Sequence, residues 1–505
     1  MKDKIIFTAV LSSVAALCGC VGVDSDVASR PSVYWKAPKD AMPENYVAPE
    51  QIKTDKIETP AESSDKQKPA KAKTEGPKDL TAAEKFEAGA ELDLPDIVDL
   101  ALENNTTTRI YWFQAKQYAA AKGKANSAYY PQLTVGGQLY RAKNKPSYGI
   151  TGLPVGSYYE TGYGPSAQIN WLIYDFGKRE AQVESARDAL RAANFEYNQS
   201  IQDVVFNVNV AYYNYYAAVG SVNAAEQSLQ DCKVAFDSAD KKLKAGVGNR
   251  QDMLNALASL KNAEYVVESK RADVETARAN LANAVGVRVS SLTKISESVK
   301  IPTSPESERK IDELIGEAMK GRQSLMASYA VLSKTRRDIA IAERAYLPQI
   351  GAQAAANYVV YSQSSRNDAY EYQVGLTASW DIFDGFNRRY DLISAKAKER
   401  AQAQQLKSDQ IVIISDVWAS YHLYRSALKQ VASADAAVKA GEEAYQATRT
   451  GFESGVSTIT DLLNAQASLA TARQTSVSAN AVLSNSIARL SHAVGALGSK
   501  IPLED

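Results

Sequence analysis

The sequence predicts a mainly α-helical chain with a small number of membrane β-strands, built from two copies of one plan. No proline lies within 166–301 or 349–501, and such stretches permit very long helices because proline breaks the helical hydrogen-bond ladder. Segments of alternating polar and apolar residues lie near the start of each stretch and are typical of strands. The phrase WLIYDFGKR at 171–179 returns 209 positions later as WDIFDGFNRR at 380–389, which indicates an internal repeat.

The N-terminus predicts export. An apolar run from Ile5 to Leu17 follows two lysines and is too short to span a bilayer, so we expect residues 1–19 to be a secretory signal. The residues Leu17-Cys18-Gly19-Cys20 resemble the bacterial lipobox, in which the last cysteine is lipidated. That resemblance implies a lipid anchor on Cys20; an ordinary cleaved signal peptide with an incidental cysteine pair is the alternative. Several acyl chains on one cysteine would give a firm membrane anchor.

Residues 20–91 form the predicted anchor segment and tether. From Pro31 to Gly89 the chain is rich in Lys, Glu, Pro, Ala and Ser and has few large apolar residues, so it cannot offset the entropy of ordering. We expect a flexible tether, with the aromatic residues Tyr34, Trp35 and Tyr46 packing locally on the folded body. Cys232 is the only other thiol after Cys18 is removed, so no intramolecular disulfide is expected.

Composition argues against several function classes. Lys plus Arg and Asp plus Glu number 58 each, so bulk charge does not favour nucleic acid as a partner. The two histidines leave little room for metal or acid-base chemistry. We find no phosphate-binding GxxxxGK[ST], no GxSxG and no His-Glu zinc pattern, and we therefore expect no enzyme, no metal and no cofactor beyond the lipid.

Heptad spacing predicts helices packed as coiled coils. Apolar residues alternate spacings of three and four at Val205, Val208, Tyr212, Tyr215, Val219 and Val222, and again at Ile414, Val417, Tyr421, Tyr424, Leu428 and Val431. From Gly177 to Gly246, and from Phe386 to Gly455, each helix extends over 69 residues. At 1.5 Å per residue each is about 100 Å long.

The repeat divides the chain into 92–300 and 301–505. Each copy reads helix, Pro-Gln, strand, loop, strand, turn, long helix, Gly turn, long helix. The offset changes from 217 upstream to 209 downstream, so eight extra residues lie in the first copy between Pro131 and Trp171. We expect them in the loop NKPSYGITGLPVGSYYETGYGP, which is rich in Gly and Pro.

Alternation over about ten residues predicts strands with one lipid-facing and one water-facing side. The alternation of apolar and polar residues extends over 166–173 and 372–382. A half-buried sheet of a soluble protein has the same pattern and is the alternative. Four strands cannot close a barrel, and a membrane tolerates no open sheet edge, so several chains must share one barrel.

These features together resemble the TolC-like outer-membrane efflux proteins, in their lipoprotein branch. The resemblance rests on LDLPDIVDLALENN at 92–105, on YPQ and LPQ at 130–132 and 347–349, on both strand-end phrases, and on the two Gly-Val turns. It implies a homotrimer with a shared twelve-stranded β-barrel in the outer membrane and a twelve-helix α-barrel in the periplasm. It also implies a gate at the helix tips, a periplasmic adaptor and an inner-membrane transporter as partners.

The resemblance assigns gate residues near the tips. Asp461 matches an acid that faces the pore, so three copies would form a ring of carboxylates that raise one another's pKa and attract cations. Asn464 stands where the family can place a second acid, and Phe452 where it often has an aromatic residue. Asp252 and Asp461 also fit near-capping boxes with Asn249 and Thr458. Helix capping for Asp252 and packing for Phe452 are the alternatives.

Other residues are assigned to docking and to the membrane. The tip residues Gly246, Val247, Gly248, Gly455, Val456 and Ser457 match the family's adaptor-docking motif, with turn formation alone as the alternative. Trp171 and Trp380 are expected in aromatic girdles, or in the core of a soluble sheet. The resemblance thus implies the exit duct of an efflux system; a type I protein secretion channel and a lipid-anchored coiled-coil scaffold are the alternatives.

Overall fold

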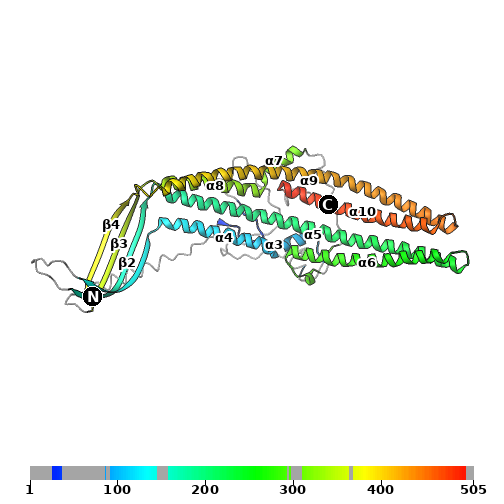
Figure 1. Cartoon of the computed structure of the whole chain (residues 1–505), viewed down its shortest axis with the longest axis horizontal. Coiled ribbons are helices and arrows are strands. Elements are labelled where there is room, and N and C mark those ends of the chain that lie inside the picture. The colour runs from blue at the N-terminus through cyan, green and yellow to red at the C-terminus, as the bar shows by residue number, and fades with distance from the viewer. Residues whose placement is uncertain are drawn as a thin grey trace, which may run out of the picture. The chain divides into compact units, whose positions relative to one another are not determined.

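The computed structural model describes residues 26–36, 86, 91–144, 157–292, 295–296, 310–362 and 368–495. These residues are mostly helical and include one antiparallel sheet (Figure 1). The chain divides into two compact units. Unit 1 comprises 1–27, 114–194 and 327–407, and unit 2 comprises 28–113, 195–326 and 408–505. No helix in the described ranges is long and apolar enough to cross a membrane.

Two series of elements follow the same order. The first is α3 (Leu94–Asn104), α4 (Thr106–Asn126), η3 (Ser127–Tyr129), β1 (Gln132–Asn144), β2 (Tyr158–Tyr174), α5 (Lys178–Lys244), α6 (Arg250–Val285) and η4 (Val289–Ser291). The second is α7 (Ile311–Gly321), α8 (Gln323–Arg344), β3 (Gln349–Tyr361), β4 (Ala369–Ser379), α9 (Asn387–Ser454) and α10 (Ile459–Val494). The predicted long helices are confirmed, since α5 has 67 residues and α9 has 68.

Unit 1 contains the sheet, whose strands pair antiparallel in the order β1-β2-β3-β4. Its register separates two faces, because directly paired residues point to the same side. One row across all four strands is Leu133, Ile169, Ala354 and Val374, and the next is Thr134, Gln168, Ala355 and Gln373. Large apolar side chains such as Tyr372 and Leu376 are exposed. The sheet therefore has an exposed apolar face and a polar face, and β1 and β4 are its edges.

The strand boundaries correct two expectations. Residues 158–165, expected in a loop because of their Gly and Pro content, belong to β2 and pair with β1. Pro165 fits there because β2 skips Gly164 and Pro165 in its pairing with β3. In the second copy β4 ends at Ser379, so Trp380 and Ile382 lie beyond it. The remaining part of the expected loop, 145–156, lies outside the described residues.

Helices of unit 2 pack around apolar clusters, two of which join the long helices to their neighbours. One joins α3, α5 and the end of α6 through residues such as Ile97, Val208 and Leu281, which are almost fully buried. The other brings α5, α6, α9 and α10 together at the far ends of the helices; its members are Ala235, Ala239, Ala256, Tyr445, Phe452, Ile459, Leu462 and Leu469. Heptad positions such as Val208, Tyr212 and Tyr424 are buried, as coiled-coil packing predicts.

The N-terminal residues 26–36 pack on the folded chain. Trp35 stacks edge-on against Phe195, and Tyr34 and Trp35 join a cluster with Tyr197 and Ile201. The expected local packing of Tyr34 and Trp35 is therefore confirmed, and this part of the expected tether is ordered. Tyr46 and the rest of the expected tether, apart from Phe86 and Glu91, lie outside the described residues.

Candidate functional site

Each helical hairpin of unit 2 reverses at a glycine. Gly246 has φ +73° and Gly455 has φ +84°, a left-handed conformation in which a side chain is strained. The main-chain N–H of Val247 donates to the carbonyl of Lys242, and that of Val456 donates to Gly451. These bonds close the last turns of α5 and α9. The expected turn role of Gly246 and Gly455 is thus confirmed.

The two turns differ in where they place a second glycine. In the first, a Cβ on Gly248 would lie 2.6 Å from the main-chain nitrogen of Leu243. In the second, a Cβ on Gly451 would collide with the Ser457 hydroxyl. At the 209-residue offset Lys242 matches Gly451, and Gly248 matches Ser457. Main-chain atoms therefore exclude a side chain at Gly248, whereas at Gly451 the obstacle is a serine side chain. The first turn has a lysine at position 242, where the second has Gly451.

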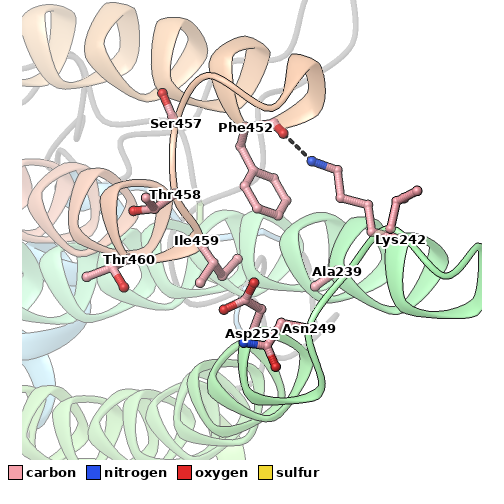
Figure 2. A pocket seen from close by; sticks show the side chains of 11 residues that line it. Ala239, Lys242, Asn249, Asp252, Phe452, Ser457, Thr458, Ile459 and Thr460 are labelled. Carbon is pink, nitrogen blue, oxygen red and sulfur yellow. Dashed lines mark hydrogen bonds between the residues drawn. The ribbon is translucent and has the colours of Figure 1, made fainter.

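A cavity of about 410 Å³ lies between the two turns. Figure 2 shows residues from both hairpins around it; the lining is Ala239, Lys242, Val247, Gly248, Asn249, Asp252, Phe452, Ser457, Thr458, Ile459 and Thr460. The structure thus brings Asp252, Phe452 and three of the expected docking residues to one cavity. Asp461 and Asn464 are not among its lining residues.

Lys242 joins the two hairpins. Its ammonium group donates to the main-chain carbonyl of Phe452 and lies 4.0 Å from the centre of that residue's ring (Figure 2). Phe452 is only 5% exposed and belongs to the apolar cluster of the four helices. Within one chain Phe452 is therefore a packing residue of the apolar cluster, which was the alternative expectation. Its ring also contacts the ammonium group of Lys242. Sequence reasoning missed Lys242; the lysine-for-glycine difference between the repeats was the available signal.

Asp461 completes a capping box at the start of α10. Its Oδ2 accepts from the Thr458 hydroxyl at 2.6 Å and from the Thr458 N–H at 2.9 Å, while its own N–H donates to Thr458 Oγ1. These bonds hold the pKa of Asp461 below its usual range within one chain. The carboxylate and Asn464 are both solvent-exposed.

The first hairpin has only half of such a box. Asn249 caps α6 by accepting from the Gln251 N–H at 3.0 Å. Among the described residues no hydrogen bond returns from Asp252 to the main chain of Asn249, so the expected near-capping box is incomplete there. Asp252 instead lines the cavity (Figure 2).

The outermost points of the turns are apolar. Val247 is 78% exposed and Val456 is 85% exposed, each next to the left-handed glycine of its turn. Exposed valines in rigid turns offer contact area to a partner at little ordering cost. The docking role remains a prediction.

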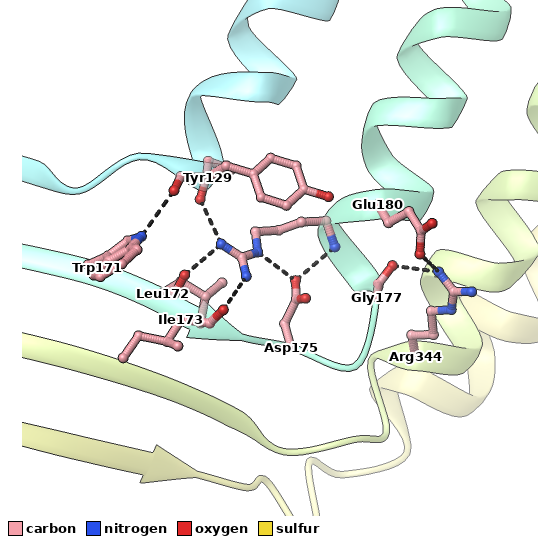
Figure 3. Close-up of polar contacts among 10 residues, drawn as sticks. Tyr129, Trp171, Leu172, Ile173, Asp175, Gly177, Glu180 and Arg344 are labelled. Carbon is pink, nitrogen blue, oxygen red and sulfur yellow. Dashed lines mark hydrogen bonds and ion pairs between the residues drawn. The ribbon is translucent and has the colours of Figure 1, made fainter.

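In unit 1 an arginine fixes the junction between β2 and α5 (Figure 3). Arg179 pairs with Asp175 at 3.2 Å and donates to the carbonyls of Leu172 at 2.5 Å and Ile173 at 2.9 Å. The guanidinium also donates to Ala128 and lies over the Tyr129 ring. The planar fork of an arginine suits such a set of carbonyls.

The junction between β4 and α9 repeats this arrangement. Arg388 pairs with Asp384 at 2.9 Å and lies over the ring of Tyr346. In both junctions two successive residues are left-handed: Phe176 and Gly177 in the first, Gly385 and Phe386 in the second. The sequence phrase DFG or DGF thus encodes a sharp reversal, and the basic residue four positions after Asp secures it.

Both tryptophans expected in the girdles are exposed, and each indole N–H donates a hydrogen bond to a main-chain carbonyl just before the first strand of its pair. Trp171 Nε1 donates to Tyr129 (Figure 3), and Trp380 Nε1 donates to Tyr346. Their exposure contradicts the alternative of a soluble core within one chain. The girdle itself remains a prediction.

Cys20 lies outside the described residues. Cys232 is buried beside Ser259, and burial raises the pKa of its thiol. No cluster of three His, Cys, Asp or Glu side chains suited to a metal occurs in the ranges described above.

Comparison with known proteins gives concordant matches. A family model described as "Outer membrane efflux protein" matches residues 97–287 and 314–496. Protein CyaE of Bordetella pertussis is 24% identical over 414 residues, 81% of this chain and 85% of that protein. Outer membrane efflux protein BepC of Brucella suis is 23% identical over 346 residues, 68% of this chain and 72% of BepC. The Campylobacter jejuni CmeC outer membrane channel has the same fold, with a TM-score of 0.70 at 17% identity, covering 90% of this chain and 96% of CmeC.

Proposed function

Because the chain belongs to the outer membrane efflux protein family, we propose that it is the outer-membrane exit duct of a tripartite efflux system. It passively conducts small amphipathic compounds delivered by a periplasmic adaptor and an inner-membrane transporter. The observation that carries this proposal is the sheet, with one apolar face, one polar face and two free edges. Such a sheet suits a membrane barrel that several chains share.

The assembly proposed is a homotrimer. Free strand edges inside a bilayer leave main-chain groups unpaired, so β4 of one chain pairs with β1 of the next. Three chains of four strands close a twelve-stranded barrel. The two matched ranges and the two series of elements support an internal duplication, with repeats at 92–300 and 301–505. Pairs of long helices from three chains supply the periplasmic α-barrel.

The proposed gate lies at the two turns. The contact of Lys242 with Phe452 holds the hairpins of one chain together, and Asp252 lines the cavity between them. Exposed Asp461 and Asn464 face the pore, where three Asp461 carboxylates attract cations. The exposed valines at 247 and 456, with the adjoining turn residues Gly246, Gly248, Gly455 and Ser457, dock the adaptor.

The membrane contacts proposed are a lipid on Cys20 and a girdle at Trp171 and Trp380. Trp171 lies near the end of β2 and Trp380 directly follows β4, and both are exposed, as interfacial residues are. A signal peptide at 1–19 delivers the chain to the periplasm. The long helices then extend from the outer membrane into the periplasm.

The test compares efflux with its rivals in cells. We expect the protein in the outer-membrane fraction, and we expect its deletion to raise the accumulation of an amphipathic dye such as ethidium, with restoration by the intact gene. Unchanged dye accumulation together with loss of one secreted protein would instead indicate type I secretion. A protein absent from the outer-membrane fraction would indicate a periplasmic scaffold and would refute the duct.

A further inference from the structure

We propose that residues 26–36 form a strap, docked through its main chain on side chains of α4 and α5, that fixes where the lipid-bearing N-terminus leaves the folded chain. The docking stands on contacts within each unit. The lipid on Cys20 rests on the proposed function, so the two are tested separately.

In unit 2 buried side chains bind the strap's main chain. The Asn198 amide accepts from the Trp35 N–H at 2.9 Å and donates to the Trp35 carbonyl at 3.0 Å. The Tyr197 hydroxyl contacts the carbonyls of Val33 at 2.8 Å and Arg30 at 3.1 Å. These hydrogen bonds hold the strap by its main-chain groups.

Two further contacts secure the same part of the strap. Trp112 Nε1 donates to the Ala28 carbonyl at 2.9 Å, and the Trp35 ring lies 5.4 Å from that of Phe195 at right angles. Ala28 is 6% exposed and packs with Tyr197 and Ile201. The strap thus supplies both hydrogen-bond partners and apolar cover.

The groove is incomplete without the strap. Tyr197 and Asn198 are buried, and the strap's carbonyls are the partners of the Tyr197 hydroxyl. A buried polar group that loses its partner is destabilising unless water replaces it. Of the hydrogen bonds that the Asn198 side chain makes within the described residues, the 3.3 Å bond to Gln323 would remain. The strap is therefore an integral element of the fold.

In unit 1 the first described residue of the strap is also held. Asp26 forms a 2.8 Å ion pair with Lys122 on α4, and its carbonyl accepts from Asn194 on α5 at 3.0 Å. Val27 is buried against Ala115, Ala119 and Leu190.

This attachment limits the reach of the N-terminus. Cys20 precedes Asp26 by six residues, which span about 20 Å at most. Lys122 lies one helical turn before the end of α4 at Asn126, and β1 begins at Gln132. On our proposal, the six-residue segment is therefore only just long enough for Cys20 to reach lipid near the start of β1. Residues 37–91 follow the strap in the chain and add nothing to this reach, so they are not the anchor's tether.

Thiol labelling tests the docking in the full-length protein. In a Cys18→Ser, Cys232→Ser background we compare Ala28→Cys with Val33→Cys, a strap position that is 44% exposed. We expect a maleimide to label Ala28→Cys at least tenfold more slowly. Adding Tyr197→Phe and Asn198→Ala should raise its rate toward that of Val33→Cys, with helix content by circular dichroism unchanged. Equal rates for Ala28→Cys and Val33→Cys in the parent would overturn the docking.

A second arm tests the short reach. Deleting residues 22–25 leaves Cys20 two residues from Asp26, so lipid insertion and docking should compete and Ala28→Cys should label faster. Replacing Cys20 with Ser in that protein should restore slow labelling, and deleting 60–63 should have no effect. Slow labelling in the lipidated deletion variant, or fast labelling that persists with Cys20→Ser, would overturn the reach argument. Absence of lipid on the intact protein would refute the anchor alone, because the comparison of positions 28 and 33 can be made equally with Cys20→Ser added to the background.

Discussion

Lys242 of the first hairpin donates to the carbonyl of Phe452 of the second and lies 4.0 Å from the centre of its ring. The two residues are 210 positions apart, and each is next to the turn of its own hairpin. For a half-buried lysine, a charge-assisted hydrogen bond and a cation–π contact made by the same ammonium group are together worth about 1–2 kcal/mol. On our proposal this pair stabilises the closed arrangement of the tips.

Lys242→Met should loosen the tips. The variant keeps the length of the side chain but removes the charge and the donor, so we expect about 1–2 kcal/mol less stabilisation of the closed state, or roughly tenfold more open time. Single-channel recording of the purified protein measures this. Lys244→Met is the matched control, because Lys244 is exposed and pairs with Asp240 of its own helix. Equal open times for both variants would remove Lys242 from the gate.

Gly248→Ala should destabilise the first turn. The added Cβ would lie 2.6 Å from the Leu243 nitrogen, so main chain must shift, at a cost of about 1–3 kcal/mol. Gly316→Ala in α7 has no atom within 4 Å and should be neutral or stabilising by about 0.5–1 kcal/mol. Urea unfolding followed by circular dichroism compares the two. A Gly248→Ala midpoint equal to the parent's would show that the turn relaxes freely.

Arg179→Lys should weaken the first junction more than Arg388→Lys weakens the second. Arg179 is buried and donates to three carbonyls, whereas Arg388 donates to Ala345 and is less buried. A lysine cannot reproduce the planar fork, so we expect a loss of about 2–4 kcal/mol at position 179 and about half of that at 388. The yield of heat-modifiable oligomers in detergent reports the loss. The reverse order would contradict this account of the junctions.

The stability of unit 2 should fall in acid partly through Asp203. Partial burial acts to raise the pKa of Asp203, but hydrogen bonds from His492 and Gln199 outweigh it and hold the pKa below its usual range. The unfolded chain therefore binds the proton first, at about pH 4, so the contribution is present above that pH and is lost as the pH falls through the folded pKa. The carboxylate is about half exposed, so solvent screening limits the effect to about 1 kcal/mol.

Asp203→Asn tests this linkage. The variant should be less stable than the parent at pH 7, and the difference should shrink toward pH 3, as measured by urea midpoints at each pH. Asp240→Asn, in an exposed pair, should show no such convergence. A constant difference between parent and Asp203→Asn across this range would refute the linkage.

The long helices and the turns could be predicted from the sequence because residues close together in the chain determine them. Proline-free heptads located α5 and α9 to within two residues, and glycine located both turns. The start of β2 was wrong because Gly164 and Pro165 signal a turn, whereas pairing with β1 keeps the segment extended. Lys242 was missed, and of the strap only the packing of Tyr34 and Trp35 was predicted, because these contacts join residues far apart in the chain, which periodicity does not report.

Conductance of the purified full-length protein in planar lipid bilayers tests the central proposal most directly. We predict detergent-stable oligomers that insert and conduct ions passively, mostly closed, with longer openings in Lys242→Met and weaker cation preference in Asp461→Asn. Oligomers that insert but carry no current, even with Lys242→Met and Asp461→Ala combined, would contradict the duct.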